Sequence, residues 1–340
     1  MARRLWLALA LMCMLAQNVQ AQTRGVAVQV NEGGALPTVS QLQTVLNPGD
    51  IVRDVLGWTQ VDASCNLAGD PSLPIAIPAS MATLYANVQG AQGANFVTLA
   101  FNNPNCGQIS YLGSVTFPNT DALRAEFAAY AVAVVKQVPA LAGVSIWNEM
   151  NGSFGGSYTS VAARLTNYCA LANKVITEIR KVDPAIPIAI GASTGWNIDG
   201  WFIHMFDTYG CMGKGDPTIW LDVHPYLTGK TNKQGVTDWQ LWNRKIAKIR
   251  ADGITNKLIA TEWGANAAYN WLTANPGGNY MTIFDANVVT PDPSWAGLAW
   301  FELQSDSKFP DDGLYGASGI SLTELGKQYL GAYRYFSVGR

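Results

Sequence analysis

The stretch Ser145-Ile146-Trp147-Asn148-Glu149-Met150-Asn151 begins as an apolar run and ends in polar side chains. Short apolar runs without strict alternation are typical of parallel strands that are buried on both faces. Ile259-Ala260-Thr261-Glu262-Trp263-Gly264 has the same form. We therefore interpret both stretches as buried strands, each of which carries a glutamate at its carboxyl end.

Six further runs of this kind occupy the rest of the chain, and helical patterns separate them. Leu123, Phe127 and Tyr130, for example, fall on one helical stripe. The eight predicted strands are Gly25–Val30, Ile51–Gly57, Phe96–Phe101, Val144–Trp147, Ile186–Ile190, Ile219–Val223, Leu258–Ala260 and Gly297–Phe301. No Pro/Ser-rich linker divides them, and no glycine-rich phosphate turn follows the first strand. The pattern predicts an α/β protein that folds as a single (β/α)8 TIM barrel rather than a doubly wound sheet.

Composition narrows the possible partners. Charged residues make up 14% of the 340 residues, compared with about 25% in average soluble domains. The net charge is −2 and no basic stripe is present, so we predict no nucleic-acid partner. The 12 Trp residues are more than a core of this size needs. Indole faces often line sugar clefts, although most of these residues also suit core packing.

The N-terminal residues form a targeting pattern. Arg3 and Arg4 precede the apolar run Leu5–Ala16, which is too short to span a bilayer as a helix. Val19-Gln20-Ala21 matches a small-residue cleavage site. The sequence therefore predicts a signal peptide over residues 1–21 and a mature domain over residues 22–340. The mature protein would be secreted or periplasmic and would have no membrane anchor.

Four cysteines remain after such a cleavage, which allows three disulfide pairings. We favour Cys65 with Cys106 and Cys169 with Cys211, because each pair belongs to neighbouring elements of the predicted barrel. The sequence contains no CxxC motif and no Cys/His cluster. We therefore expect no metal site and no cofactor.

Glu149 and Glu262 end the fourth and seventh predicted strands, which face one another across the mouth of an eight-stranded barrel. Enzymes of this fold carry their chemistry at that mouth. Two carboxyl groups about 5–5.5 Å apart are what a retaining glycosidase needs, one protonated and the other ionised. The alternative is that each glutamate is an ordinary loop carboxylate.

The motifs Trp147-Asn148-Glu149 and Thr261-Glu262-Trp263-Gly264 resemble the acid/base and nucleophile motifs of clan A glycoside hydrolases. The resemblance extends over essentially all of residues 22–340. Within the clan the chain is most similar to small bacterial members of family 39, with family 5 next. The resemblance implies a retaining O-glycoside hydrolase with a carbohydrate substrate, in which Glu149 is the acid/base and Glu262 the nucleophile.

Other positions match the clan pattern one by one. Arg53 resembles the arginine that keeps the nucleophile ionised, because a guanidinium lowers the pKa of a neighbouring carboxyl. Asn148 resembles the asparagine that binds the sugar 2-OH, and a strand-end cap is its alternative role. In His224-Pro225-Tyr226, the resemblance implies that the tyrosine donates to the nucleophile and that the histidine lines the sugar site. A packed histidine is the alternative.

Some aromatic and amide side chains are weaker candidates for substrate binding. Trp300 resembles the aromatic floor beneath the sugar, and a core tryptophan is the alternative. Asn102 follows the third predicted strand and suits either a sugar contact or a turn. Trp58 and Trp196 follow the second and fifth strands, where they would flank a cleft. We interpret His204, which lies in a helical pattern, as a packing residue.

Two other functions compete with this interpretation. A non-catalytic carbohydrate-binding protein on a barrel scaffold would keep the tryptophans but need not keep both glutamates. A metal-dependent hydrolase fits poorly, because the chain has only two histidines. The substrate is either a glycan that contains xylose or arabinose or a bacterial exopolysaccharide. We expect no appended β-sandwich of the kind found in larger family 39 enzymes, and we expect a monomer.

Overall fold

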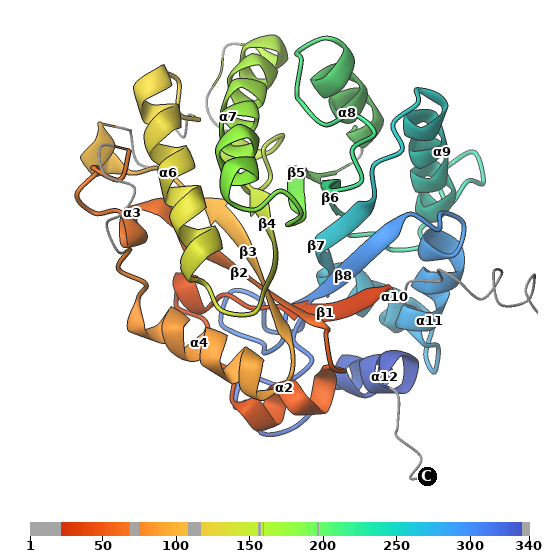
Figure 1. Cartoon of the computed structure of the whole chain (residues 1–340). Coiled ribbons are helices and arrows are strands. Elements are labelled where there is room, and N and C mark those ends of the chain that lie inside the picture. Colours follow the sequence, from red (N-terminus) through yellow and green to blue (C-terminus); the bar gives the residue numbers. More distant parts are fainter. Residues whose placement is uncertain are drawn as a thin grey trace, which may run out of the picture.

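The computed structural model describes residues 22–68, 75–107, 117–155, 158, 160–195 and 197–334. Eight parallel strands close into one barrel in the order of the chain, and helices surround it (Figure 1). The predicted (β/α)8 barrel is therefore confirmed. The strands are β1 (Thr23–Ala27), β2 (Ile51–Gly57), β3 (Ala94–Ala100), β4 (Leu141–Ile146), β5 (Ile188–Thr194), β6 (Ile219–His224), β7 (Leu258–Gly264) and β8 (Trp295–Phe301).

Most of the surrounding helices begin where the sequence supplies an N-cap side chain. Thr38, Thr120, Ser160, Thr237 and Thr323 each accept a hydrogen bond from a backbone N–H in the first turn. The helices are α2 (Val39–Val45), α3 (Trp58–Val61), α4 (Ala79–Gly90), α6 (Asp121–Gln137), α7 (Val161–Val182), α8 (Ile198–Asp207), α9 (Asp238–Ala251), α10 (Ala265–Ala274), α11 (Tyr280–Phe284) and α12 (Glu324–Tyr333).

The observed strand ends differ from the predicted ones where polar residues continue a strand. β5 continues through Thr194, and β7 continues past Ala260 through Glu262 to Gly264. The polar residues Ser193, Thr261 and Glu262 are buried. Because the strands were predicted from runs of apolar residues, the polar residues that continue them were not recognised. The predicted strands therefore stop too early at these places.

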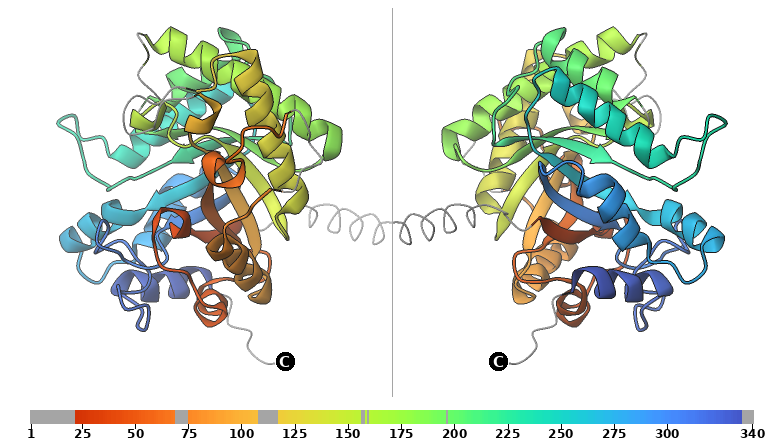
Figure 2. Two further views of the ribbon diagram at one scale, coloured as in Figure 1. Left: turned by 90° about the vertical axis from the view of Figure 1, so that its left-hand side faces the viewer. Right: turned by 90° about the vertical axis from the view of Figure 1, so that its right-hand side faces the viewer.

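The wall of the barrel separates two layers because successive strand residues point to opposite sides. Between the strands and the helices lies the larger apolar cluster, which includes Val26, Trp58, Trp263 and Trp300. A smaller apolar cluster fills the inside of the barrel, and its buried members are Ala27, Ile51, Phe96, Ala189, Ile259, Ala299 and Phe301. The two side views show the helices packed around the strands (Figure 2).

Two disulfides join neighbouring segments of the chain, and their pairing is the one that we favoured from the sequence. Cys65 bonds to Cys106 with the Cα atoms 5.3 Å apart. Cys169 of α7 bonds to Cys211, which follows α8, with the Cα atoms 4.6 Å apart. The predicted pairing is therefore confirmed. The predicted signal peptide over residues 1–21 lies outside the described residues.

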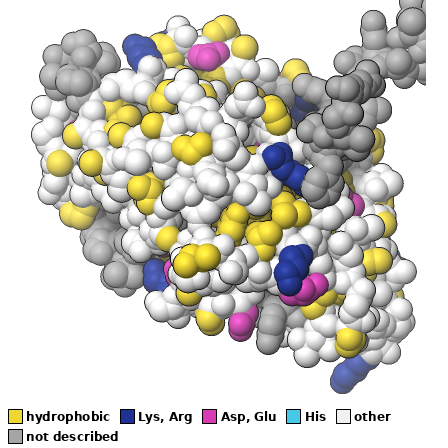
Figure 3. All heavy atoms as spheres, turned by 90° about the horizontal axis from the view of Figure 1, so that it is seen from below, with side chains coloured by type: hydrophobic (Ala, Val, Ile, Leu, Met, Phe, Trp, Pro, Cys, Tyr) yellow, Lys and Arg dark blue, Asp and Glu magenta, His cyan; other side chains and the backbone are white. Residues whose placement is uncertain are grey.

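The face of the molecule seen from below carries few charged side chains, which are scattered among many neutral atoms (Figure 3). In the described part of the chain, no helix combines the length and apolarity needed to cross a membrane. His204 lies on the exposed side of α8, so its interpretation as a packing residue is wrong.

Candidate active site

The two glutamates singled out by the sequence meet at the carboxyl ends of β4 and β7. Glu149 Oε1 lies 3.2 Å from Nδ1 of His224, and Glu262 Oε2 lies 3.6 Å from the same nitrogen. One oxygen of each carboxyl group and a ring nitrogen of His224 all lie within 4.8 Å of one another. Residues 113 positions apart in the sequence thus share one small space at the barrel mouth.

The backbone before Glu149 leaves regular strand geometry. Trp147 and Glu149 have φ angles of 73° and 41°, a left-handed region that side chains other than glycine seldom adopt. The turn is held by Asn151, whose side chain donates to the Thr194 carbonyl at 2.6 Å and accepts from the Thr194 N–H at 2.9 Å. Strain of this kind concentrates at functional sites, and here it orients a carboxyl group.

Glu262 is held as a carboxylate. Arg53 Nη1 lies 2.7 Å from its Oε1, and the Tyr226 hydroxyl donates to its Oε2 at 2.6 Å. Burial by itself raises the pKa of this carboxyl group, but Arg53, His224 and Tyr226 outweigh burial and lower the pKa below its usual 4.5. Glu262 is therefore ionised at neutral pH, the form that a nucleophile requires.

Arg53 connects three strands from inside the barrel. Its side chain is buried and its guanidinium uses all three nitrogens. Nε donates to Thr98 Oγ1 of β3 at 2.9 Å, and Nη2 donates to Asn148 Oδ1 at 2.9 Å. Nη1 pairs with Glu262. This planar fork fixes the orientation of the carboxylate and of the Asn148 amide. The Asn148 oxygen is thereby occupied, which leaves the amide NH2 as the group that can donate to a ligand.

His224 lies between the glutamates and a second buried carboxylate, Asp222. His224 Nε2 is 3.0 Å from Thr261 Oγ1, and that hydroxyl is 2.9 Å from each oxygen of Asp222. Burial lowers the pKa of His224, but Glu262, Glu149 and Asp222 raise it further, so the net shift is upward. The sequence analysis identified neither Asp222 nor Thr261 as a partner of His224. Asp222 lies two residues before His224, so alternation places both on one face of β6.

The prediction that Trp300 forms the floor beneath the sugar is wrong. Its ring is fully buried and meets Trp263 edge-on, with ring centroids 5.0 Å apart. It belongs to the layer between strands and helices, and its Nε1 donates to the Asp312 carbonyl. The adjacent Phe301 is on the inner side, 6.4 Å from Tyr226 in an edge-on arrangement. A one-residue offset along a strand exchanges its two faces.

Trp58, which the sequence predicted to flank a cleft, is one of the residues that line the hollow described below, although most of its side chain is buried. Trp58 begins α3, and its side chain is buried against Phe127 with ring centroids 5.2 Å apart. Its Nε1 donates to Asp62 Oδ2 at 3.1 Å. The ring therefore belongs to the outer apolar layer. The other flanking candidate, Trp196, lies outside the described residues.

A hollow of about 290 Å³ lies on the same face as the two glutamates. All of its lining segments follow the carboxyl ends of β1, β2, β3 and β8. Asn102, which the sequence offered as a sugar contact, is one of the lining residues. The full lining is Asn31, Glu32, Gly57, Trp58, Thr59, Gln60, Phe101, Asn102 and Lys308.

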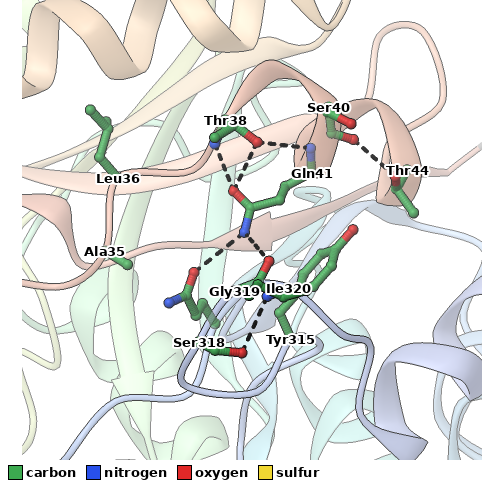
Figure 4. A pocket seen from close by; sticks show the side chains of 11 residues that line it. Ala35, Leu36, Thr38, Ser40, Gln41, Thr44, Tyr315, Ser318, Gly319 and Ile320 are labelled. Carbon is green, nitrogen blue, oxygen red and sulfur yellow. Dashed lines mark hydrogen bonds between the residues drawn. The ribbon is translucent and has the colours of Figure 1, made fainter.

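A larger cavity of about 580 Å³ lies between the segment after β1 and the segment before α12, and neither glutamate lines it (Figure 4). Its polar groups are neutral and bond to one another. Gln41 Nε2, for example, donates to the Gly319 carbonyl at 2.9 Å and to Gln304 Oε1 at 3.4 Å. We place the chemistry at the glutamates instead, because the ionisable groups converge there.

Two groups of three potential metal ligands occur among the described residues. In the first, Asp62 lies beside Cys65 and Cys106, whose sulfurs are joined in a disulfide. In the second, Glu149 and His224 lie beside Glu262, whose oxygens are already bound by Arg53 and Tyr226. Hydrogen bonds and ion pairs thus account for this second arrangement, and we do not interpret it as a metal centre.

No protein-family model and no curated protein sequence matches the chain. Solved structures do match it over most of its length. A family 39 glycoside hydrolase from the gut symbiont Bacteroides cellulosilyticus WH2 has 19% identity and a TM-score of 0.65, with 92% of this chain and 64% of that chain covered. A family 39 β-xylosidase from Caulobacter crescentus has 14% identity and a TM-score of 0.63, with 91% and 70% covered.

A family 5 xyloglucanase from Paenibacillus pabuli has 13% identity and a TM-score of 0.59, and the match covers 92% of this chain and 97% of that chain. The chain thus spans less than two thirds of the Bacteroides protein and nearly all of the Paenibacillus protein. These likenesses show that the chain shares its fold with glycoside hydrolases of families 39 and 5.

Proposed function

We propose that this chain is a retaining glycoside hydrolase of clan A and that it resembles the enzymes of family 39 in particular. One observation carries the proposal. An ionised carboxylate, clamped by Arg53 and Tyr226, has an oxygen within 4.8 Å of an oxygen of Glu149. Carboxyl groups about 5–5.5 Å apart suit double displacement, whereas inverting enzymes need about 6.5–9.5 Å.

Each group has a defined part in the reaction. Glu262 attacks the anomeric carbon while Glu149 gives its proton to the departing glycosidic oxygen, which leaves as an alcohol. Glu149, now ionised, takes a proton from water, whose oxygen displaces Glu262 and restores both groups. Arg53 and Tyr226 keep Glu262 ionised and oriented between turnovers. Asn148 donates its amide NH2 to the sugar 2-OH.

The proposed substrate is a neutral glycan. The hollow over β1, β2, β3 and β8 offers Asn102 as a neutral polar contact, and among the residues that the structure describes Glu32 and Lys308 are its charged lining residues. These opposite charges give the hollow no net preference for a charged sugar. The β-xylosidase and the xyloglucanase named above act on glycans that contain xylose. We therefore propose a glycan containing xylose or arabinose, or a neutral exopolysaccharide, as substrate.

We further propose that the protein is exported. Two disulfides join Cys65 to Cys106 and Cys169 to Cys211, and disulfides of this kind persist in oxidising compartments. The targeting pattern over residues 1–21 points the same way. Gel filtration of the secreted product would test the expected monomer.

A panel of neutral polysaccharides and aryl glycosides tests the proposed activity. We expect release of reducing ends by the parent chain and loss of that release in Glu262→Gln and Glu149→Gln. Proton NMR of the first product should show the anomeric configuration of the substrate retained. Inversion would contradict the double displacement. Binding across the panel with no release by the parent chain would favour the non-catalytic sugar-binding protein instead.

A further inference from the structure

Asp222 is a carboxylate sealed inside the barrel beneath the two glutamates, and the proposed reaction does not use it. Its side chain is completely buried. The Ser145 hydroxyl donates to Oδ2 at 2.6 Å, and the Thr261 N–H donates to Oδ1 at 3.2 Å. The Thr261 hydroxyl lies 2.9 Å from both oxygens. Every one of these neighbours can donate a hydrogen bond, as an ionised carboxylate requires.

The Thr261 hydroxyl has one proton, and this limits what His224 can do. When that proton points to Asp222, the hydroxyl oxygen can only accept from His224 Nε2, 3.0 Å away. His224 therefore carries a hydrogen on Nε2. In the neutral ring, Nδ1 then presents a lone pair to Glu149 Oε1 at 3.2 Å, and this contact is favourable when Glu149 carries a proton.

We propose that Asp222 is a positioning residue that, through Thr261 and His224, keeps one proton on the His224–Glu149 pair for delivery to the leaving group. The inference rests on the proposed function, because it takes Glu149 as the general acid. An aspartate that fixes a histidine tautomer from behind is a known catalytic arrangement. Here a threonine hydroxyl stands between the two side chains.

The charges around the pair support this role. His224 faces Glu149 from the end of β4, Glu262 from β7 at 3.6 Å and Asp222 from its own strand at 3.9 Å. The Tyr226 ring meets it edge-on at 6.4 Å. Three carboxyl groups around the imidazole of His224 favour an additional proton on the His224–Glu149 pair. Removing the charge of any one of them makes that proton easier to lose.

Asp222 itself faces few ionisable groups. His224 on β6 and Arg53 on β2 favour its ionised form, and Tyr168 on α7 is the other titratable group near it. Burial raises the pKa of Asp222, whereas His224, the Ser145 and Thr261 hydroxyls and Arg53 oppose that rise. The net shift of this pKa is upward, so the ionised form of Asp222 depends on the hydrogen bonds from Ser145 and Thr261 and on the charges of His224 and Arg53.

Asp222 also has a structural role that the test must separate. The ladder between β6 and β7 pairs Leu221 with Leu258 and Asp222 with Ile259. Beyond these pairs, the Thr261 N–H donates to the Asp222 side chain. A purely structural aspartate would affect stability and all substrates equally. A proton-holding aspartate would change the pH profile and the dependence on the leaving group.

The test is Asp222→Asn, which keeps the shape and removes the charge. We expect the alkaline limb of kcat/KM to move down by about one pH unit. We also expect about a tenfold or greater loss with an alkyl or unactivated aryl glycoside, whose leaving oxygen needs a proton. A dinitrophenyl glycoside, whose leaving group needs no proton, should lose much less.

Thr261→Val and Thr261→Ser complete the test should Asp222→Asn fail to fold. The valine variant keeps the charge but removes the relaying hydroxyl, so it should reproduce the dependence on the leaving group. The serine variant keeps the hydroxyl and should restore the parent behaviour. Ser145→Ala is the matched control for Thr261→Val, since it also removes one hydrogen-bond donor to Asp222 but leaves the Thr261 relay in place, and its dependence on the leaving group should stay that of the parent.

The outcomes separate this inference from the proposed function. If the parent chain hydrolyses no glycoside, the proposed function fails and the inference fails with it. If the parent chain is active and Glu149→Gln shows the leaving-group dependence of a lost general acid, the proposed function stands. An unmoved alkaline limb in Asp222→Asn, with equal losses for both classes of leaving group, would then overturn the role of Asp222 alone.

Discussion

Arg53 and Asp54 are adjacent on β2 and both are buried, yet they lie on opposite sides of the barrel wall. Arg53, on the inside, has a partner for each guanidinium nitrogen. Asp54, on the outside, has an Oδ2 with no hydrogen-bond partner among the described residues. Burial raises its pKa to about 8, although the Val55 N–H and Arg53 oppose the rise. Hydrogen bonds and an ion pair thus stabilise the charge of Arg53 on the inside of the wall, whereas burial keeps the carboxyl group of Asp54 neutral on the outside.

β8 shows the same contrast. Trp300 is packed into the outer apolar layer, and Phe301 faces the inside near Tyr226. The next residue, Glu302, is buried with an Oε1 that has no hydrogen-bond partner in the described part of the chain. Burial and the nearby Asp306 and Asp312 raise its pKa to about 8. Lys308 opposes this rise only weakly, so the buried carboxyl group of Glu302 is mostly protonated at neutral pH.

Glu262→Gln should produce the largest effect on the inner side. Without a carboxylate no glycosyl-enzyme forms, and we expect kcat/KM to fall by about 10⁴-fold or more. Initial rates on an aryl glycoside measure the change. Azide should restore turnover in Glu262→Ala, because a small anion can enter the space that the carboxylate leaves. Hydrolysis within tenfold of the parent rate would remove Glu262 from the mechanism.

Arg53→Met should disturb both stability and chemistry. It leaves Glu262 as an uncompensated buried charge, which typically costs about 3–5 kcal/mol. Because Arg53 lowers the pKa of Glu262, its loss should move the acidic limb of kcat/KM to higher pH. Urea unfolding and a pH–rate profile measure the two effects. Arg53→Lys is the control, since it keeps the charge but not the fork, and an acidic limb that stays in place in Arg53→Met would contradict the pairing.

Trp300→Ala and Phe301→Leu compare the two faces of β8. The first removes a packed ring from the outer layer and should cost about 3–5 kcal/mol of unfolding free energy. Its kcat/KM per folded molecule should stay near the parent value. The second should cost less than about 1.5 kcal/mol but should alter KM or kcat, because Phe301 adjoins Tyr226. The reverse pattern would show that the two rings are assigned to the wrong sides.

Asp54→Asn should have the smallest effect on activity, and its effect on the free energy of unfolding should depend on pH. The folded pKa is about 8 and the ordinary value is 3.8, so the folded state binds the proton more tightly. The parent therefore has the full stabilisation from this proton below pH 3.8 and loses it as pH rises through 8. The variant lacks this loss, so its unfolding free energy relative to that of the parent should rise with pH between pH 4 and pH 8, by up to about 1.4 kcal/mol per pH unit. A Tm difference that does not change between pH 4 and 8 would contradict the buried neutral form.

The sequence alone determined the architecture and the two glutamates. Eight apolar runs with helical patterns between them are a strong signal, and their polar ends placed Glu149 and Glu262 on the same rim. Consecutive βα units likewise indicated which cysteines pair. These features depend on chain order and local pattern, which a sequence contains in full.

Tertiary structure decided which side of the wall each residue faces and which groups meet across strands. Both residues of the pair Trp300-Phe301 are aromatic, so the sequence could not tell the inner ring from the outer one. Asp222 and Thr261 lie 39 positions apart, and neither belongs to a local motif that predicts their contact. The pairing of β6 with β7 brings Asp222 and Thr261 together, and only this spatial neighbourhood links a buried charge to His224.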